Sequence, residues 1–159
     1  MTETIKTIKI IEPSNEIAEL QEAVVAELSQ LLPKSSVESI GSMAVPISGK
    51  SEIDVMIVSD DVAGDSKLLL EKGYRQGPFE YEKDISYLST KKNGIRIDIQ
   101  ILPTGHKRIE LHRKTLRKLR EDIVLRKAYE QFKQSLNGLP QDEYKKRKVE
   151  WIKNNLLID

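Results

Sequence analysis

The chain has 159 residues, of which 38% are hydrophobic and 32% are charged, and it contains no cysteine. This composition fits one globular domain and excludes a disordered chain, disulfide bonds and thiolate metal sites. No apolar stretch approaches the roughly 20 residues of a membrane span, and the N-terminus lacks the apolar core of a signal peptide, so we expect a cytoplasmic protein without a membrane partner.

The formal net charge of +1 combines two segments of opposite sign. Residues 1–106 contain 11 basic and 17 acidic residues, whereas residues 107–153 contain 15 basic and 7 acidic residues. The basic segment is compatible with an anionic partner. The alternative is that its charges simply form solvated helix faces.

The first predicted elements are a short strand within residues 2–11 and a helix that starts near Pro13 and ends at Pro33. Apolar residues recur along this helix at spacings of three and four, namely Ile17, Leu20, Val24, Leu28 and Leu31. Residues 37–40 and 52–58 then predict two strands, the second rich in isoleucine and valine.

A short helix is predicted over residues 66–72, with Gly73 as its C-cap. Strands are predicted over residues 81–90 and 95–101. They are joined through Asn93-Gly94, which favours a tight hairpin because both residues tolerate positive φ.

The pattern is helical from residue 106 onward, and Asp142 can cap the last helix. No repeat or linker divides the chain, so we expect a single domain over residues 1–159. Its α/β core covers about residues 12–105, and its basic C-terminal helices cover about residues 106–157. This order predicts an α+β fold with a mixed or mainly antiparallel sheet and helices packed on one face.

Alternation along two predicted strands places three acidic side chains where they can meet. Glu52 and Asp54 share one strand face, and Asp98 lies opposite an apolar row on its own strand. If the strands are neighbours, the carboxylates converge and need a cation to offset their repulsion, which predicts a Mg²⁺ or Mn²⁺ site. The alternative is that Asp54 and Asp98 merely face solvent.

The predicted loop over residues 41–50 begins with Gly41-Ser42. Glycine lets the backbone approach a phosphate closely, and the backbone N–H and the serine hydroxyl can donate hydrogen bonds to it. A lone Gly-Ser pair is weak evidence. The informative feature is the order: strand, Gly-Ser, Glu-x-Asp on a strand, and an aspartate on a later strand.

This order resembles the nucleotidyltransferase superfamily that includes DNA polymerase beta, with Gly41-Ser42, Glu52-Ile53-Asp54 and Asp98 in the matching positions. The chain also resembles the GrpB family over roughly residues 12–156. That resemblance rests on Ile40-Gly41-Ser42-Met43-Ala44-Val45-Pro46, Lys50, Ile53-Asp54, Leu119-Arg120, Tyr129, Phe132-Lys133, Tyr144, Lys148 and Trp151-Ile152.

Some positions depart from the GrpB pattern. GrpB-like proteins commonly have an apolar residue at the position of Glu52 and a histidine-containing strand at Ile97-Asp98-Ile99. Met43 and Ile123 replace a common threonine and proline. The two acidic departures move the chain toward the catalytic superfamily pattern and favour metal binding.

The resemblance implies a Mg²⁺- or Mn²⁺-dependent nucleotidyltransferase, which transfers a nucleoside monophosphate from a nucleoside triphosphate to an acceptor. The acceptor is a small molecule, a protein or an RNA end, and so small a domain can work as a homodimer. Glu52 and Asp54 would hold the metal ions, while Asp98 would complete one metal site and help to deprotonate the acceptor hydroxyl. The alternative is a non-catalytic nucleotide- or RNA-binding module of the GrpB type.

Other residues would have to hold the phosphates. Gly41 and Ser42 are the candidates in the loop, and Lys133 and Lys148 are the preferred cations because they occupy family-like positions. Lys50 is closer to the acids in sequence.

Arg96 is a further candidate for phosphate binding, although a simple ion pair with Asp98 on the same strand face is an equal alternative. We interpret His106 and His112 as structural or surface residues, because their six-residue separation does not place them on one helical face. The helical spacing of the C-terminal aromatic residues favours core packing over base stacking.

Overall fold

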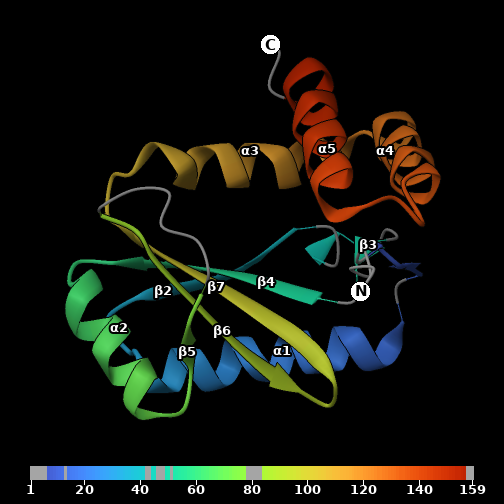
Figure 1. Cartoon of the computed structure of the whole chain (residues 1–159). Helices are drawn as coiled ribbons and strands as arrows, with labels where there is room; N and C mark the ends of the chain where they lie inside the picture. Colours follow the sequence, from blue (N-terminus) through green and yellow to red (C-terminus); the bar gives the residue numbers. More distant parts are fainter. Residues whose placement is uncertain are drawn as a thin grey trace.

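The computed structural model describes residues 7–12, 14–41, 44–45, 49–50, 52–77 and 84–156. Its central sheet has five strands in the order β2-β4-β7-β6-β5 (Figure 1). The strands are β2 (Ser36–Ile40), β4 (Glu52–Ser59), β5 (Arg75–Gln76), β6 (Ser86–Lys92) and β7 (Ile95–Pro103). The central β4–β7 pair is parallel, and the other pairs are antiparallel, so the expectation of a mixed sheet is confirmed.

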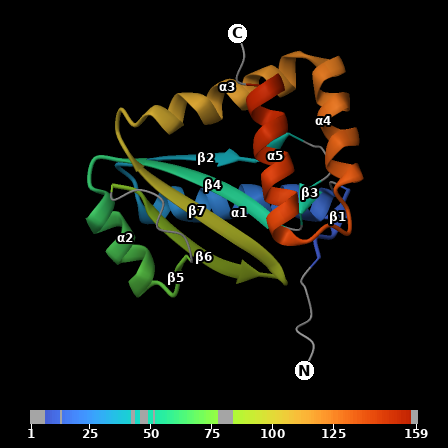
Figure 2. The ribbon, with the colours of Figure 1, turned by 45° about the horizontal axis from the view of Figure 1, so that its top comes forward.

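Helices cover both faces of the sheet. The helices α1 (Asn15–Leu31) and α2 (Val62–Glu71) pack on one face. The helices α3 (Lys107–Glu121), α4 (Ile123–Ser135) and α5 (Gln141–Asn155) lie over the other face, as Figure 2 shows. A separate two-stranded ribbon joins β1 (Ile10–Ile11) to β3 (Gly49–Lys50). The α+β class is confirmed, and the C-terminal helices provide the second layer.

The two faces of β4 explain why the acids lie under the C-terminal helices. Ile53, Val55 and Ile57 are fully buried in the core that α1 and α2 form with the sheet. Because side chains alternate along a strand, Glu52, Asp54 and Met56 face the other way. Met56 is fully buried in the second core, which includes residues of α3 and α4.

Local signals at the start and end of α1 agree with the sequence expectation. The Ser14 hydroxyl accepts a hydrogen bond from the backbone N–H of Ile17, which caps the helix. The helix ends at Leu31, just before Pro33. The strand expected within residues 2–11 is shorter than predicted: β1 spans Ile10–Ile11, and residues 1–6 lie outside the described part.

Several boundaries differ from the sequence expectation. α2 begins four residues early, because the Asp61 carboxylate accepts from the Gly64 N–H and caps the helix there. β6 begins at Ser86 rather than near residue 81, although residues 81–83 lie outside the described part. The hairpin at Asn93 and Gly94 is confirmed, with φ angles of 53° and 76°.

The C-terminal region contains two breaks. Asp122 ends α3, and its carboxylate caps α4 by accepting from the Leu125 N–H at 3.0 Å. The expectation that Asp142 caps the last helix is wrong, because Pro140 occupies the N-cap position and Asp142 lies in the first turn. None of the described helices is long and apolar enough to cross a membrane.

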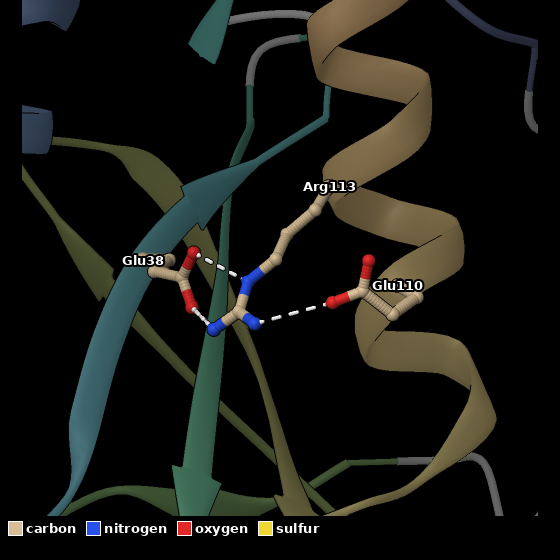
Figure 3. A network of polar contacts seen from close by, with 3 residues as sticks. All are labelled: Glu38, Glu110 and Arg113. Atoms are coloured by element: carbon tan, nitrogen blue, oxygen red, sulfur yellow. Dashed lines mark hydrogen bonds and ion pairs between the residues drawn. The ribbon is translucent and has the colours of Figure 1, made fainter.

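An ion-pair network ties α3 to the edge of the sheet (Figure 3). Arg113 donates from Nε and Nη2 to the two carboxylate oxygens of Glu38, at 3.1 and 2.7 Å. Its Nη1 donates to Glu110 at 3.4 Å. The bidentate contact links α3 to β2 beside the acid-bearing face.

We expect Arg113→Ala to lower the free energy of unfolding by only about 0.5 kcal/mol, because exposed ion pairs are screened by water and salt. The Arg113 side chain is 42% exposed, which supports this small value. Urea unfolding at low and high salt measures the effect. A loss above about 2 kcal/mol that persists in high salt would contradict the prediction.

Candidate functional site

The register of β4 and β7 brings the three predicted acids together. Asp54 lies opposite Asp98, and Glu52 lies opposite Arg96. One carboxylate oxygen from each of Glu52, Asp54 and Asp98 lies within 4.8 Å of the others, and all three residues are partly buried. An all-oxygen donor set of this kind fits a hard divalent cation such as Mg²⁺ or Mn²⁺.

Arg96 partly neutralises this cluster. Its Nε donates to Oδ1 of Asp98 at 2.8 Å, so the ion pair that the sequence left as an alternative is present. Burial tends to lower the pKa of Arg96, but the hydrogen bond and charge of Asp98, with the charges of Glu52 and Asp54, raise it above the usual value. Three carboxylates this close repel one another, and a divalent cation bound among them would offset that repulsion.

Gly41 lies directly against Asp54. Ile40, the last residue of β2, pairs with Asp54, and Gly41 then adopts a φ of +81°. A Cβ atom at position 41 would lie 2.5 Å from Oδ2 of Asp54. Glycine is therefore required both by the backbone conformation and by the close approach to the carboxylate. Ser42 and the side chain of Lys50 lie outside the described residues.

Two cavities meet at the carboxylates. The larger, about 300 Å³, is lined by Gly41, Glu52 and Asp54 and by mainly apolar residues of α3, α4 and α5. The smaller, about 250 Å³, is lined by Asp54, Asp98 and residues of β6, β7 and α5. Asp54, Gln100 and Lys148 line both cavities, so these residues stand between them.

The two preferred lysines differ in position. Lys148 lines both cavities, and its Nζ lies 5.9 Å from the centre of the Tyr144 ring. Lys133 is only 2% exposed and donates from Nζ to the Tyr144 hydroxyl at 2.6 Å. It is absent from the described lining of either cavity, so the structure brings Lys148, and not Lys133, to the cavity wall.

Tyr144 connects Lys133 to the smaller cavity, which the tyrosine lines. Burial is the main cause that raises the pKa of Tyr144 to about 12; nearby Lys148 opposes the shift, while Glu52 and Asp54 add to it. The phenol therefore stays neutral near pH 7, and its oxygen accepts from Lys133.

The cavity walls include residues that the sequence did not indicate as site residues, among them Gln100 and His112. Gln100 shares the strand face of Asp98, as strand alternation predicts, and it lines the smaller cavity beside that acid. His112, which the sequence predicts to be a structural or surface residue, lines the larger cavity, and its Nε2 lies 3.2 Å from Oε1 of Gln100. Its place depends on how α3 packs across the sheet, which no local pattern shows.

The C-terminal aromatic residues pack against one another, as expected. The Tyr129 and Trp151 rings stack with centroids 4.9 Å apart, and Phe132 stacks on Trp151 at 5.3 Å. These contacts join α4 to α5. They belong to the second core, so the core-packing interpretation is confirmed.

The partly buried side chain of His112 predicts a pH effect on stability. Burial, followed by the positive charges of Arg108 and Lys148, lowers the pKa of His112 to about 4. The unfolded chain has a histidine pKa of about 6.5, so between about pH 6.5 and 4 it binds a proton that the folded state does not bind. The contribution of neutral His112 to the free energy of unfolding is therefore complete above about pH 6.5 and is lost as the pH falls from about 6.5 to about 4.

Lowering the pH from 7 to 4.5 should reduce the free energy of unfolding of both proteins. We expect this reduction to be smaller in His112→Gln than in the unsubstituted chain, by more than about 1 kcal/mol. Urea unfolding of both proteins at the two pH values measures this difference. Equal losses in the two proteins would show that His112 does not carry the effect.

A family model described as GrpB protein matches residues 7–156 of the chain. Among curated proteins, no match is found. The fold is similar to the crystal structure of conserved protein GrpB from Enterococcus faecalis, with a TM-score of 0.70 and 22% identity over 91% of this chain and 98% of that one.

The fold is also similar to larger transferases. For the Cid1 poly(U) polymerase the TM-score is 0.52 with 17% identity, over 72% of this chain and 39% of that one. For a cytoplasmic RNA terminal U-transferase the TM-score is 0.53 with 19% identity, over 72% of this chain and 38% of that one. For Cid1 in complex with the UTP analogue UMPNPP, the TM-score is 0.52 with 16% identity, over 72% of this chain and 39% of that one. The sheet and its helices thus have a nucleotidyltransferase-like fold.

Proposed function

The chain belongs to the GrpB family, and from its site geometry we propose that it is a nucleotidyltransferase dependent on Mg²⁺ or Mn²⁺. It would transfer a nucleoside monophosphate from a nucleoside triphosphate to an acceptor hydroxyl. The observation that carries the proposal is the convergence of Glu52, Asp54 and Asp98, within 4.8 Å, where two cavities meet. A nucleotidyltransferase-like fold supports it.

The different walls of the cavities suggest different occupants. The larger cavity contains Gly41, Glu52 and Asp54, and its apolar helical wall suits a nucleobase. The smaller cavity contains Asp98 and suits the acceptor. Lys148 borders both cavities and would neutralise phosphate charge where the two substrates meet.

The reaction follows from this arrangement. The acceptor oxygen forms a bond to the α-phosphorus, the bond from that phosphorus to the bridging oxygen of the β-phosphate breaks, and pyrophosphate leaves. Asp98 would take the proton of the acceptor hydroxyl, while Arg96 holds its carboxylate in place. Glu52, Asp54 and Asp98 would hold the cations, which when bound neutralise phosphate charge. Lys133 would act through Tyr144, which it orients toward the smaller cavity.

A second candidate function is nucleotide or RNA binding without transfer. The observation that favours it is the ion pair between Arg96 and Asp98, because it engages the carboxylate that transfer would need as a base. In this version the same cavities hold the ligand, and the net positive segment from residue 107 to 153 supports an anionic partner.

Incubation with each labelled nucleoside triphosphate, Mg²⁺ and cell extract separates the two functions. We expect pyrophosphate release and a labelled acceptor, both lost in Asp98→Asn because that variant lacks the proton acceptor. Glu71→Gln is the matched control, since Glu71 is exposed at the end of α2 on the other face of the sheet. Nucleotide binding without release of pyrophosphate would reject transfer and leave the binding function.

A further inference from the structure

The acid-bearing face continues beyond the carboxylates toward one edge of the sheet. Residues that pair directly across neighbouring strands share a face. Asp98 of β7 pairs with Ser89 of β6, and Ser89 pairs with Arg75 of β5. A parallel row joins Arg96 of β7 to Lys91 of β6. Two rows of side chains therefore lead from the carboxylate cluster toward β5, on the side of the sheet opposite β2 (Figure 1).

These rows line a third cavity, the cationic groove, of about 570 Å³. Its wall includes the three basic residues Arg75, Lys91 and Arg96 and the hydroxyl-bearing residue Ser89 of the same face, together with Thr90. Among the described residues that line it, none is acidic. This donor set, with permanent positive charge and hydroxyl groups, is the chemistry that recognises phosphate.

Arg96 connects the groove to the carboxylates. Its hydrogen bond to Asp98 uses Nε, and the guanidinium also lines the groove. Arg75 and Lys91 are exposed, and they lie on β5 and β6, the strands that follow β7 toward this edge of the sheet. Since neighbouring strands lie about 4.8 Å apart, the backbone of Arg75 is about 10 Å from that of Asp98.

We propose that the cationic groove binds a phosphate group of the acceptor while the acceptor hydroxyl lies at Asp98. The acceptor is then a phosphate-bearing molecule, either the end of an oligoribonucleotide or a small phosphate ester. The role as acceptor rests on the proposed function, but phosphate binding by the groove can be tested without it.

The direct test measures a fluorescein-labelled single-stranded oligoribonucleotide of about eight nucleotides by fluorescence anisotropy, without metal or nucleoside triphosphate, at several KCl concentrations. We expect the double variant Arg75→Ala/Lys91→Ala to weaken binding by about tenfold and to lower the slope of log affinity against log salt concentration by about 1.4. The double variant Lys34→Ala/Lys67→Ala is the matched control, because it removes the same charge from exposed positions between α1 and β2 and on α2, outside the groove and outside residues 107–153. It should bind within about twofold of the unsubstituted chain.

Competition separates the two sources of phosphate. If adenosine monophosphate displaces the oligonucleotide with similar affinity, the natural acceptor is a small phosphate ester; if it does not, the acceptor is an oligonucleotide end. The variant Arg75→Lys/Lys91→Arg should restore binding, which excludes misfolding as the cause of the loss. Unchanged affinity and salt slope in Arg75→Ala/Lys91→Ala would overturn the proposal, as would the absence of binding to either probe.

A second measurement keeps this result separate from the proposed function. Binding of a non-hydrolysable nucleoside triphosphate with Mn²⁺ depends on the carboxylates and should survive in Arg75→Ala/Lys91→Ala. If nucleotide binding is intact and Arg75→Ala/Lys91→Ala binds the phosphate probes as the unsubstituted chain does, only the proposal for the cationic groove is rejected. If the unsubstituted chain itself shows no nucleotide binding that depends on the carboxylates, the transferase proposal is rejected instead.

Discussion

Replacing Asp54 by asparagine is expected to reduce pyrophosphate release by at least about 100-fold. Asp54 is the one acid of the three that lines both of the cavities at the carboxylates, and it pairs with Asp98 in the centre of the sheet. Asparagine keeps the shape of the side chain but removes the charge that a divalent cation needs. Metal-dependent binding of nucleoside triphosphate, measured by calorimetry, should be lost together with activity.

The same substitution should leave the fold intact. Removing one of three neighbouring carboxylates relieves repulsion, so the free energy of unfolding in the absence of metal should be unchanged or higher. Glu71→Gln again serves as the control of equal charge change, and it should retain both binding and activity. Activity of Asp54→Asn within about threefold of the unsubstituted chain would mean that the carboxylate cluster is not the reaction centre.

Gly41→Ala is expected to have a large effect, on stability and on the site together. A left-handed φ of +81° disfavours any residue with a Cβ atom by about 1–3 kcal/mol. The added methyl group would also lie 2.5 Å from Oδ2 of Asp54 and must displace that carboxylate. We expect a reduced free energy of unfolding, measured with urea, and a clear loss of metal-dependent nucleotide binding.

Gly94→Ala is the matched control for this prediction. Gly94 has a similar φ of +76°, but a Cβ atom there meets nothing within 4 Å. Gly94→Ala should therefore lose stability through backbone strain alone and keep nucleotide binding. If the two variants behave alike in both measurements, the contact between Gly41 and Asp54 has no role in the site.

Strand alternation was sufficient to predict which face of its strand each acid occupies. The isoleucines of β4 and β7 identify the buried face of each strand, so the opposite face of Asp54 and Asp98 follows from a period of two. The Asn93-Gly94 turn was equally local, because positive φ is a property of the residues themselves. These features depend on residues close together in sequence, and for that reason a single sequence shows them.

Other parts of the site depend on contacts between distant segments. Nothing near Lys133 in sequence indicates that its Nζ donates a hydrogen bond to the Tyr144 hydroxyl, because that contact forms only when α4 and α5 pack together. β5 has only two residues, too few for an alternating pattern, so the row from Asp98 to Arg75 was invisible before the strands were paired. The position of His112 likewise required the packing of α3 on the sheet.

The parallel pairing of β4 and β7 also has a consequence for how the protein folds. The chain forms α2, β5 and β6 between these two strands, and β6 pairs with β7 through a tight hairpin. Local contacts close faster than distant ones, so this hairpin should form before β7 joins β4. The carboxylates of Glu52 and Asp54 on β4 therefore meet that of Asp98 on β7 only when these two strands pair. A cation that binds the assembled carboxylates would therefore slow unfolding more than it speeds folding.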